Sequence, residues 1–304
     1  MYVNYAFFPG ATGDNIEFLQ QLNKKFVPGI KLFMGASTGD MLVNDEKKLD
    51  NIFRVAKELE LPLMVHCEDS TKISTNLEDL VRELSSEELS MLLHSILRSS
   101  ETCINSTDLA IKLAKKHKTR LHIAHISTKE ELGKLTASKC NYITGEVTPA
   151  YLLFCTDDYK KLGAKIKCNP ALKYRDDRDA LRQALTKNKH IYTIGSDHAP
   201  HAIEEKQGGS LIALSGIPSI QFILPAMLEL AEKGIVTIER LVGLMCHHPA
   251  QLFSVSQRGY LREGYKADLA ILKHVKKPYR VNAEDVQSKC CWSPFEGKTG
   301  TKKQ

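Results

Sequence analysis

Ile-Gly-Ser-Asp-His-Ala-Pro-His, residues 194–201, is the stretch that decides how this chain of 304 residues is interpreted. A strand-like run, His190–Ile194, leads into it and ends at a carboxylate, two imidazoles and a rigid proline. Carboxylate and imidazole at the end of a buried strand are ligand types of a divalent metal site. Alone, Asp197 fits a helix cap equally well. A site is indicated only if other strands end in similar residues.

Strand-like and helix-like segments alternate along the chain. Helical patterns, such as the amphipathic residues 45–60 and the capping-box pattern at 127–130, separate the strand-like runs. This alternation predicts an α/β fold with a parallel sheet of βαβ units. The six strand-like runs are Tyr2–Phe8, Gly29–Met34, Leu61–His66, Arg120–Ile126, Asn141–Val147 and Lys189–Gly195. After residue 252, short strands at 259–261 and 267–272 are expected to begin a small β appendage.

Four of these strand-like segments carry or lead into a residue with metal-site chemistry. Lys31 lies within Gly-Ile-Lys-Leu-Phe-Met-Gly, where its charge is costly unless it is removed or paired. His66 ends Leu-Met-Val-His and His125 ends Leu-His-Ile-Ala-His. Functional groups of parallel α/β barrels gather at the carboxyl ends of strands. We therefore expect Lys31, His66, His125 and Asp197 to converge, although each alone has a structural explanation.

Other histidines have simpler explanations. Alternation along a strand places His122 on the face opposite to His125. His198, His247 and His248 are interpreted as structural or helix-surface residues.

Composition excludes several classes of protein. The net charge of +6 is spread over the chain, with no basic patch interleaved with aromatic residues, so nucleic-acid binding is not expected. No apolar run reaches membrane-spanning length, and the first residues lack a signal-peptide pattern. Eight cysteines without a Cys-x-x-Cys pair suggest reduced thiols. These features predict a cytoplasmic protein.

The motifs together resemble the dihydroorotases of the amidohydrolase superfamily, over nearly the whole chain. The similar segments are Lys-Leu-Phe-Met-Gly-Ala-Ser-Thr-Gly at 31–39, Val-His-Cys-Glu-Asp at 65–69, His-Ile-Ala-His-Ile-Ser-Thr at 122–128, Gly-Glu-Val-Thr-Pro at 145–149, Lys-Cys-Asn-Pro-Ala-Leu-Lys at 167–173, Ser-Asp-His-Ala-Pro-His at 196–201, Gly-Tyr-Lys-Ala-Asp-Leu at 264–269 and Trp-Ser-Pro-Phe-Glu-Gly at 292–297. The resemblance implies a (β/α)8 TIM barrel with a binuclear zinc site.

The resemblance also implies the roles of single residues. Lys31 matches the carbamylated lysine that bridges two metals, and His66 and His125 match the ligands of one metal. Asp197 matches a ligand of the other metal and the acid/base that moves a proton from the attacking water to the leaving nitrogen. The implied reaction interconverts dihydroorotate and carbamoyl aspartate in pyrimidine biosynthesis.

Four further positions match the substrate end of the family site. Asn169 and His201 match residues that hold the ring amide and the carboxylate. Ser215 and Gly216 are expected to offer backbone contacts to the ring. Asn169-Pro170 together with His201 favours a ring that carries a carboxylate, and hence dihydroorotate as the substrate. The alternative is a related allantoinase or dihydropyrimidinase.

Two family features do not occur in this sequence. The family's His-x-His pair, which supplies ligands to the second metal, is missing, and so is its carboxylate-binding arginine. We therefore expect residues 1–255 to form a partial barrel lacking its first two strands and residues 256–304 a partial β segment. This pattern fits a fragment, a late-start gene model or a pseudo-enzyme. The expected partners are the small substrate, a second copy in a homodimer, and aspartate transcarbamoylase.

Overall fold

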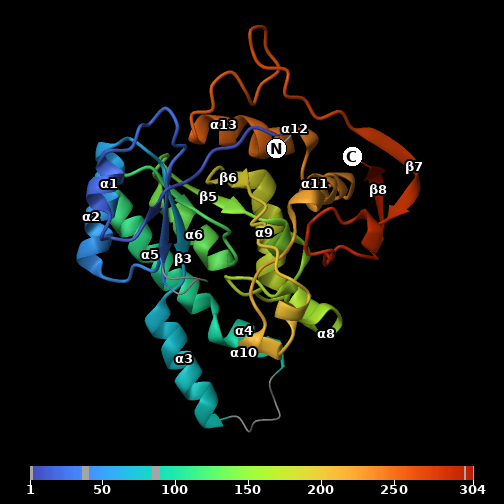
Figure 1. The fold of residues 1–304 in the computed structure, drawn as a ribbon, viewed down its shortest axis with the longest axis horizontal. Coiled ribbons are helices and arrows are strands. Elements are labelled where there is room, and N and C mark those ends of the chain that lie inside the picture. Colours follow the sequence, from blue (N-terminus) through green and yellow to red (C-terminus); the bar gives the residue numbers. More distant parts are fainter. Residues whose placement is uncertain (1–2, 36–40, 84–89, 298, 304) are drawn as a thin grey trace.

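A six-stranded parallel sheet forms the centre of the molecule, and helices surround it (Figure 1). The computed structural model describes residues 3–35, 41–83, 90–297 and 299–303. The strands follow one another in chain order across the sheet, which confirms the predicted α/β architecture. They are β1 (Gly10–Ala11), β2 (Ile30–Met34), β3 (Leu63–Cys67), β4 (Leu121–Ile123), β5 (Ile143–Val147) and β6 (Ile191–Ile194).

The first predicted strand is wrong. Tyr2 lies outside the described residues, and Val3–Phe8 form no strand. Pairing with β2 begins only at Gly10, opposite Lys31, so the earlier aromatic run has no strand beside it. Val3, Tyr5 and Phe7 remain exposed as a result. A high β-propensity does not form a strand without a neighbouring partner.

The predicted C-terminal strands are also displaced. Residues 259–261 and 267–272 form no strand, and Leu261 and Ile271 are exposed. The β segment is instead an antiparallel pair, β7 (Lys273–Arg280) with β8 (Thr299–Lys303). It lies beside α11 at the edge of the molecule (Figure 1).

At the start of α2, α6 and α12, a short polar side chain accepts a free backbone N–H group. Asp45 caps α2 by accepting from the backbone N–H of Lys48. The capping box of α6 is formed by Thr128 and Glu131, one residue later than predicted.

No helix in the described ranges is long and apolar enough to cross a membrane. The α-helices are α1 (Ile16–Gln20), α2 (Glu46–Glu58), α3 (Ser70–Glu83), α4 (Leu92–Leu97), α5 (Ser100–His117), α6 (Lys129–Ser138), α7 (Pro149–Leu153), α8 (Tyr159–Leu162), α9 (Arg175–Lys187), α10 (Gly209–Ile212), α11 (Ile223–Glu232), α12 (Ile238–Val242) and α13 (His248–Leu252).

The two faces of the sheet differ in polarity. One face consists of fully buried apolar side chains that pack against the helices, among them Ile30, Leu32, Leu63, Val65, Leu121 and Ile123. The other face carries Lys31, Met64, His122 and Thr144, which lie side by side in register. Since side chains alternate along a strand, the polar residues share this second face.

His122 therefore lies on the same face as Lys31. Its two ring nitrogens lie 2.8 Å from Thr144 Oγ1 and 2.9 Å from Thr193 Oγ1, which links β4 to β5 and β6. The prediction that His122 and His125 point to opposite faces assumed that alternation continues to His125. The strand ends at Ile123 and the backbone of His125 has a φ of 42°, so that rule no longer applies.

The outer edge of β6 is covered by side chains from the last helices. Arg240 Nη2 donates to the carbonyl of Ile191 at 2.8 Å, and His248 Nδ1 donates to the carbonyl of Tyr192 at 3.0 Å. The imidazole of His248 also stacks on the Tyr192 ring. These contacts agree with the structural role expected for His248 and satisfy backbone groups on an edge strand.

Two buried histidines predict acid sensitivity. Burial lowers the pKa of both His94 and His122 to about 3, far below the value in an unfolded chain. Between about pH 6.5 and 3 the unfolded state binds more protons, so stability is present above this window and is lost as the pH falls through it. Within this window, we expect each histidine to lower the unfolding free energy by on the order of 1 kcal/mol for each unit by which the pH falls.

Denaturant unfolding of the chain with a chelator, at pH 7, 6 and 5, measures this loss. His122→Gln should be less stable at pH 7 but should lose stability less steeply on acidification. Parallel curves for the variant and the parent chain would contradict the assignment.

Candidate metal and substrate site

Two imidazoles face each other at the carboxyl ends of β3 and β4. His66 Nδ1 and His125 Nε2 are 3.0 Å apart, and the ring centroids are separated by 4.8 Å. Both residues are buried. The contact is a hydrogen bond between the two rings, and a divalent metal could take the place of its proton, because imidazole nitrogens are common metal ligands.

Glu68 determines which nitrogen of His66 is free to bind. The fully buried carboxylate accepts a hydrogen bond from His66 Nε2 at 3.1 Å and forms an ion pair with Arg98. Burial alone would raise the pKa of this carboxyl, but the Arg98 charge and the hydrogen bond from His66 outweigh it and hold the pKa at about 2. An ionised Glu68 keeps the proton of His66 on Nε2, so Nδ1 presents its lone pair toward His125.

Lys31, Glu146 and Asp197 form the charged part of the site. Desolvation lowers the pKa of the half-buried Lys31, while the carboxylates of Glu146 and Asp197 oppose this shift. Burial raises the pKa of Glu146 to about 7, against the opposing charge of Lys31. The protein packed around Asp197 also raises the pKa of its carboxyl, although the side chain itself reaches solvent. The charges of these three groups therefore act on one another, and Asp197 remains accessible to a ligand.

Strained backbone places two of the predicted ligands. His125 and Asp197 have φ angles of 42° and 45°, a region that residues other than glycine seldom adopt. Such strain costs on the order of 1–3 kcal/mol and is concentrated at functional sites. Close packing adds a further constraint, because a Cβ on Gly195 would lie 2.2 Å from Glu146 Oε2. The strand ends are therefore shaped by the side chains of the site.

The residues fit one divalent cation if Lys31 is carbamylated. Nitrogens that share a tetrahedral zinc lie about 3.3 Å apart, close to the separation of His66 Nδ1 and His125 Nε2. Carbamylation would replace the positive charge of Lys31 by a negative one, and one divalent cation balances that change. Across the described ranges, no group of three His, Cys, Asp or Glu side chains could hold a metal without such help.

The substrate end contains an acceptor without a partner. Asn169 Oδ1 is buried and accepts no hydrogen bond from the residues that the structure describes. An orphaned acceptor of this kind is costly unless a ligand donates to it. Asn169 Oδ1 could therefore accept a hydrogen bond from the ring N–H of a ligand.

His201 and Gly216 lie together at this end. His201 Nε2 donates to the carbonyl of Ser215 at 3.1 Å, and the indole of Trp292 donates to the carbonyl of His201 at 2.8 Å. Gly216 has a φ of 152°, and a Cβ there would lie 2.4 Å from the carbonyl oxygen of Ala199. The N–H of Gly216 donates to the Lys167 carbonyl at 2.8 Å, so it is already used within the chain. Of the two expected backbone contacts, the Gly216 N–H would have to exchange partners to reach a ring.

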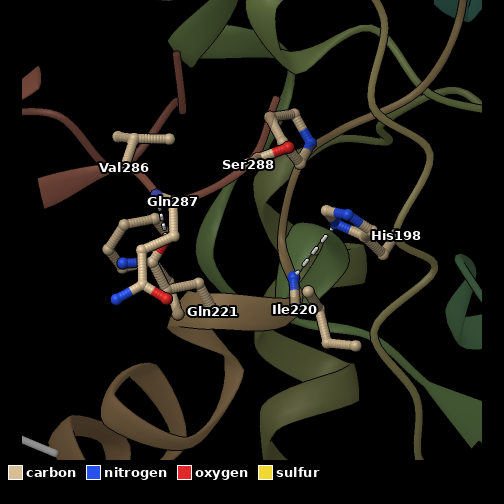
Figure 2. Close-up of a pocket in the computed structure, with 8 residues that line it drawn as sticks. His198, Ile220, Gln221, Val286, Gln287 and Ser288 are labelled. Atoms are coloured by element: carbon tan, nitrogen blue, oxygen red, sulfur yellow. Dashed lines mark hydrogen bonds between the residues drawn. The ribbon is translucent and has the colours of Figure 1, made fainter. Parts of the chain in front are cut away.

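His198 lies outside this cluster, although it follows Asp197 directly. Its Nδ1 accepts from the backbone N–H groups of Ser219 at 3.1 Å and Ile220 at 3.3 Å. The ring lines a cavity of about 370 Å³. Figure 2 shows it at one side of this cavity, across from Gln287 and Ser288. The expected structural role of His198 agrees with these two backbone contacts.

Sequence reasoning assigned no role to Glu68 or Glu146. Both lie within segments that were compared with the family; Glu68 directly follows β3, and Glu146 lies within β5. A carboxylate at such a position is as costly as the lysine in β2 and therefore carries the same signal. Arg98 could not be found this way, because it reaches Glu68 from the end of α4.

Comparison with known proteins places the chain in a family. The model described as Amidohydrolase family matches residues 18–292. The chain belongs to the amidohydrolase family. The dihydroorotase of Methanosphaera stadtmanae is 31% identical over 270 residues, which are 88% of this chain and 60% of that protein. The dihydroorotase of Archaeoglobus fulgidus is 29% identical over 305 residues, 98% of this chain and 67% of that protein. The chain thus spans about 60% of the length of the first of these curated relatives.

Solved structures agree on the fold. The L-hydantoinase (dihydropyrimidinase) from Arthrobacter aurescens has a TM-score of 0.92 at 27% identity, covering 99% of this chain and 67% of the other. The Campylobacter jejuni dihydroorotase has a TM-score of 0.64 at 20% identity, covering 93% and 74%. The six parallel strands of this amidohydrolase are those of the family's TIM-barrel fold.

Glu68 can be tested through metal affinity. Glu68→Gln removes the charge that fixes the proton of His66, and we expect zinc affinity to fall by about ten- to a hundred-fold. Competition with a chromophoric chelator measures this affinity. The surface change Glu58→Gln serves as the control and should bind zinc like the parent chain. Equal zinc affinity for both variants would show that Glu68 does not orient His66.

Proposed function

We propose that this amidohydrolase acts on a cyclic amide as a zinc-dependent dihydroorotase, interconverting dihydroorotate and carbamoyl aspartate. The observation that carries the proposal is the pair of converging imidazoles, His66 and His125, beside Lys31 and Asp197. The dihydroorotases among its relatives support the same activity.

His66, His125 and a carbamylated Lys31 would hold the zinc, with Asp197 next to them. When bound, zinc polarises the amide carbonyl and lowers the pKa of water. The ion pair between Glu68 and Arg98 keeps His66 in the tautomer that binds metal. Asp197 belongs to the same electrostatic group as Lys31 and His66.

Asp197 would move the proton. A carboxyl that is accessible to solvent and has a raised pKa can accept a proton from the attacking water and return it to the leaving ring nitrogen. Both transfers occur at the Asp197 carboxylate oxygens. The same residue then serves ring opening and ring closure.

The substrate end favours an anionic ring. Asn169 Oδ1 is free to accept the ring N–H. His201, which lies 3.8 Å from the Glu205 carboxylate, also lies near two cationic side chains, Lys167 and Lys206. Both lysines donate to carbonyls of residues 213–216, next to the Ser215 carbonyl that His201 contacts. A positive environment attracts a carboxylate, which dihydroorotate carries and a simple hydantoin lacks.

A hydantoinase or dihydropyrimidinase activity is the second candidate. The high TM-score to the L-hydantoinase favours it, because that protein has a closely similar backbone. A homodimer, a complex with aspartate transcarbamoylase and a non-catalytic role in such a complex remain proposals. Assays with dihydroorotate, carbamoyl aspartate, hydantoin and dihydrouracil, with and without that partner, separate these possibilities.

Asp197→Asn tests the chemistry. Asn keeps the shape of the side chain but cannot carry the proton, so we expect turnover to fall by roughly a hundred- to ten-thousand-fold in both directions. The change is made in a form of the protein that turns over a cyclic amide. Zinc content should be largely retained, and Asp108→Asn on the surface should behave as the parent. Near-normal turnover by Asp197→Asn would exclude its role as acid/base.

Asn169→Ala and His201→Ala test the substrate assignment. Each removes a ring or carboxylate contact, so KM for dihydroorotate should rise roughly ten- to a hundred-fold with zinc content unchanged. His201→Ala should affect dihydroorotate more than dihydrouracil, which has no carboxylate. Equal effects on both substrates would argue against carboxylate recognition by His201.

A further inference from the structure

Residues 213–216 form a loop whose four consecutive carbonyls all accept hydrogen bonds from basic side chains; we refer to it as the carbonyl loop. Lys167 Nζ donates to Ala213, and His201 Nε2 donates to Ser215 at 3.1 Å. Lys206 Nζ donates to Leu214 at 2.6 Å and to Gly216 at 2.9 Å.

Lys206 contributes more to this arrangement than either other side chain. Its ammonium makes a third contact, with the Lys167 carbonyl at 3.3 Å, which uses all three of its donors. The residue is 4% exposed. A buried ammonium is tolerated only when acceptors replace its water, and here backbone carbonyls do so. Lys206 therefore acts on the loop in the way a bound cation would.

The Lys206 ammonium also lies beside groups that hold Asn169 and His201, the two proposed substrate contacts. It lies against the Lys167 carbonyl, two residues before Asn169, and this carbonyl also accepts the N–H of Gly216. It lies 5.8 Å from the centre of the Trp292 ring, whose indole N–H holds the carbonyl of His201. One charge thus joins the Asn169 segment, the carbonyl loop and the backbone of His201.

We infer that Lys206 is a positioning residue of the substrate end, which holds the carbonyl loop and His201 in the arrangement that receives the ring. The identity of the ring rests on the proposed function. The contacts of Lys206 with the carbonyl loop do not depend on it. Burial lowers the pKa of Lys206 to about 8, and the nearby Lys167 adds to this effect. At neutral pH most molecules therefore keep all three donors on Lys206.

Substitutions at Lys206 test the inference through the separation of KM from kcat. Lys206→Met keeps most of the length of the side chain but has no donor, and KM should rise roughly ten- to a hundred-fold while kcat changes little. Lys206→Arg restores a positive donor and should recover part of the loss. Lys233→Met is the matched control, because this exposed lysine forms an ion pair with Glu229 on the surface of α11, away from the carbonyl loop. Zinc content should be the same in all variants.

The single tryptophan of the chain gives a readout that does not need activity. Trp292 is 3% exposed and lies against Lys206, so its emission reports the order of this region. Lys206→Met should shift the emission to longer wavelength and raise quenching by acrylamide, and Lys233→Met should change neither. If Lys206→Met fails to fold, Lys206→Gln, which keeps two N–H donors, should show the same changes more weakly.

The two readouts also separate the inference from the proposed function. A protein that turns over no cyclic amide, yet shows the tryptophan changes, would refute the proposed activity and leave the role of Lys206 in the loop supported. A KM within twofold of the parent together with unchanged Trp292 emission would overturn the inference. An equal loss of kcat in Lys206→Met and Lys206→Arg would also overturn it, because the effect would then lie in the chemistry.

Discussion

The charge of Lys31 is the constraint on which the centre of this molecule depends. A lysine in a parallel sheet cannot remain ionised without compensation. Glu146 and Asp197 provide this compensation from β5 and from the end of β6. The polar face of the sheet therefore requires residues from strands far apart in the sequence. Apolar packing on the opposite face holds those strands in register.

Two groups of side chains make up the candidate site. In the first, His66 and His125 contact each other, and the charges of Lys31 and Asp197 act on each other. In the second, Glu68 joins His66 to Arg98, and we propose that this pair fixes the tautomer of His66. A similar division applies at the substrate end, where Lys206 supports His201 through the backbone. In both places the chain uses a buried charge to fix the direction of a neighbouring group.

Much of this arrangement could be predicted from the sequence. Five of six strands were identified, because buried parallel strands are short apolar runs between helical patterns. The sequence also predicted that Lys31, His66, His125 and Asp197 converge. In the structure His66 contacts His125, and the charge of Asp197 acts on Lys31, which lies near the start of β2. The aromatic run before Gly10 was misassigned because pairing depends on neighbours that no local pattern reveals. His125 could not be oriented correctly, since its left-handed backbone breaks the alternation of β4. Arg98 and Lys206 reach the site from segments whose path only the tertiary structure defines.

The indole contact of Trp292 has a consequence for the integrity of the chain. The segment that joins α13 to β7 has no helix or strand and exposes Leu261, Leu269 and Ile271. Such segments are the usual sites of proteolytic nicking. Cleavage there would leave the parallel sheet covalently intact, yet it would separate the indole from the covalent chain that carries His201. Limited digestion would then convert a one-piece protein into two fragments held by noncovalent contacts, with the ring-binding end dependent on the smaller fragment staying bound.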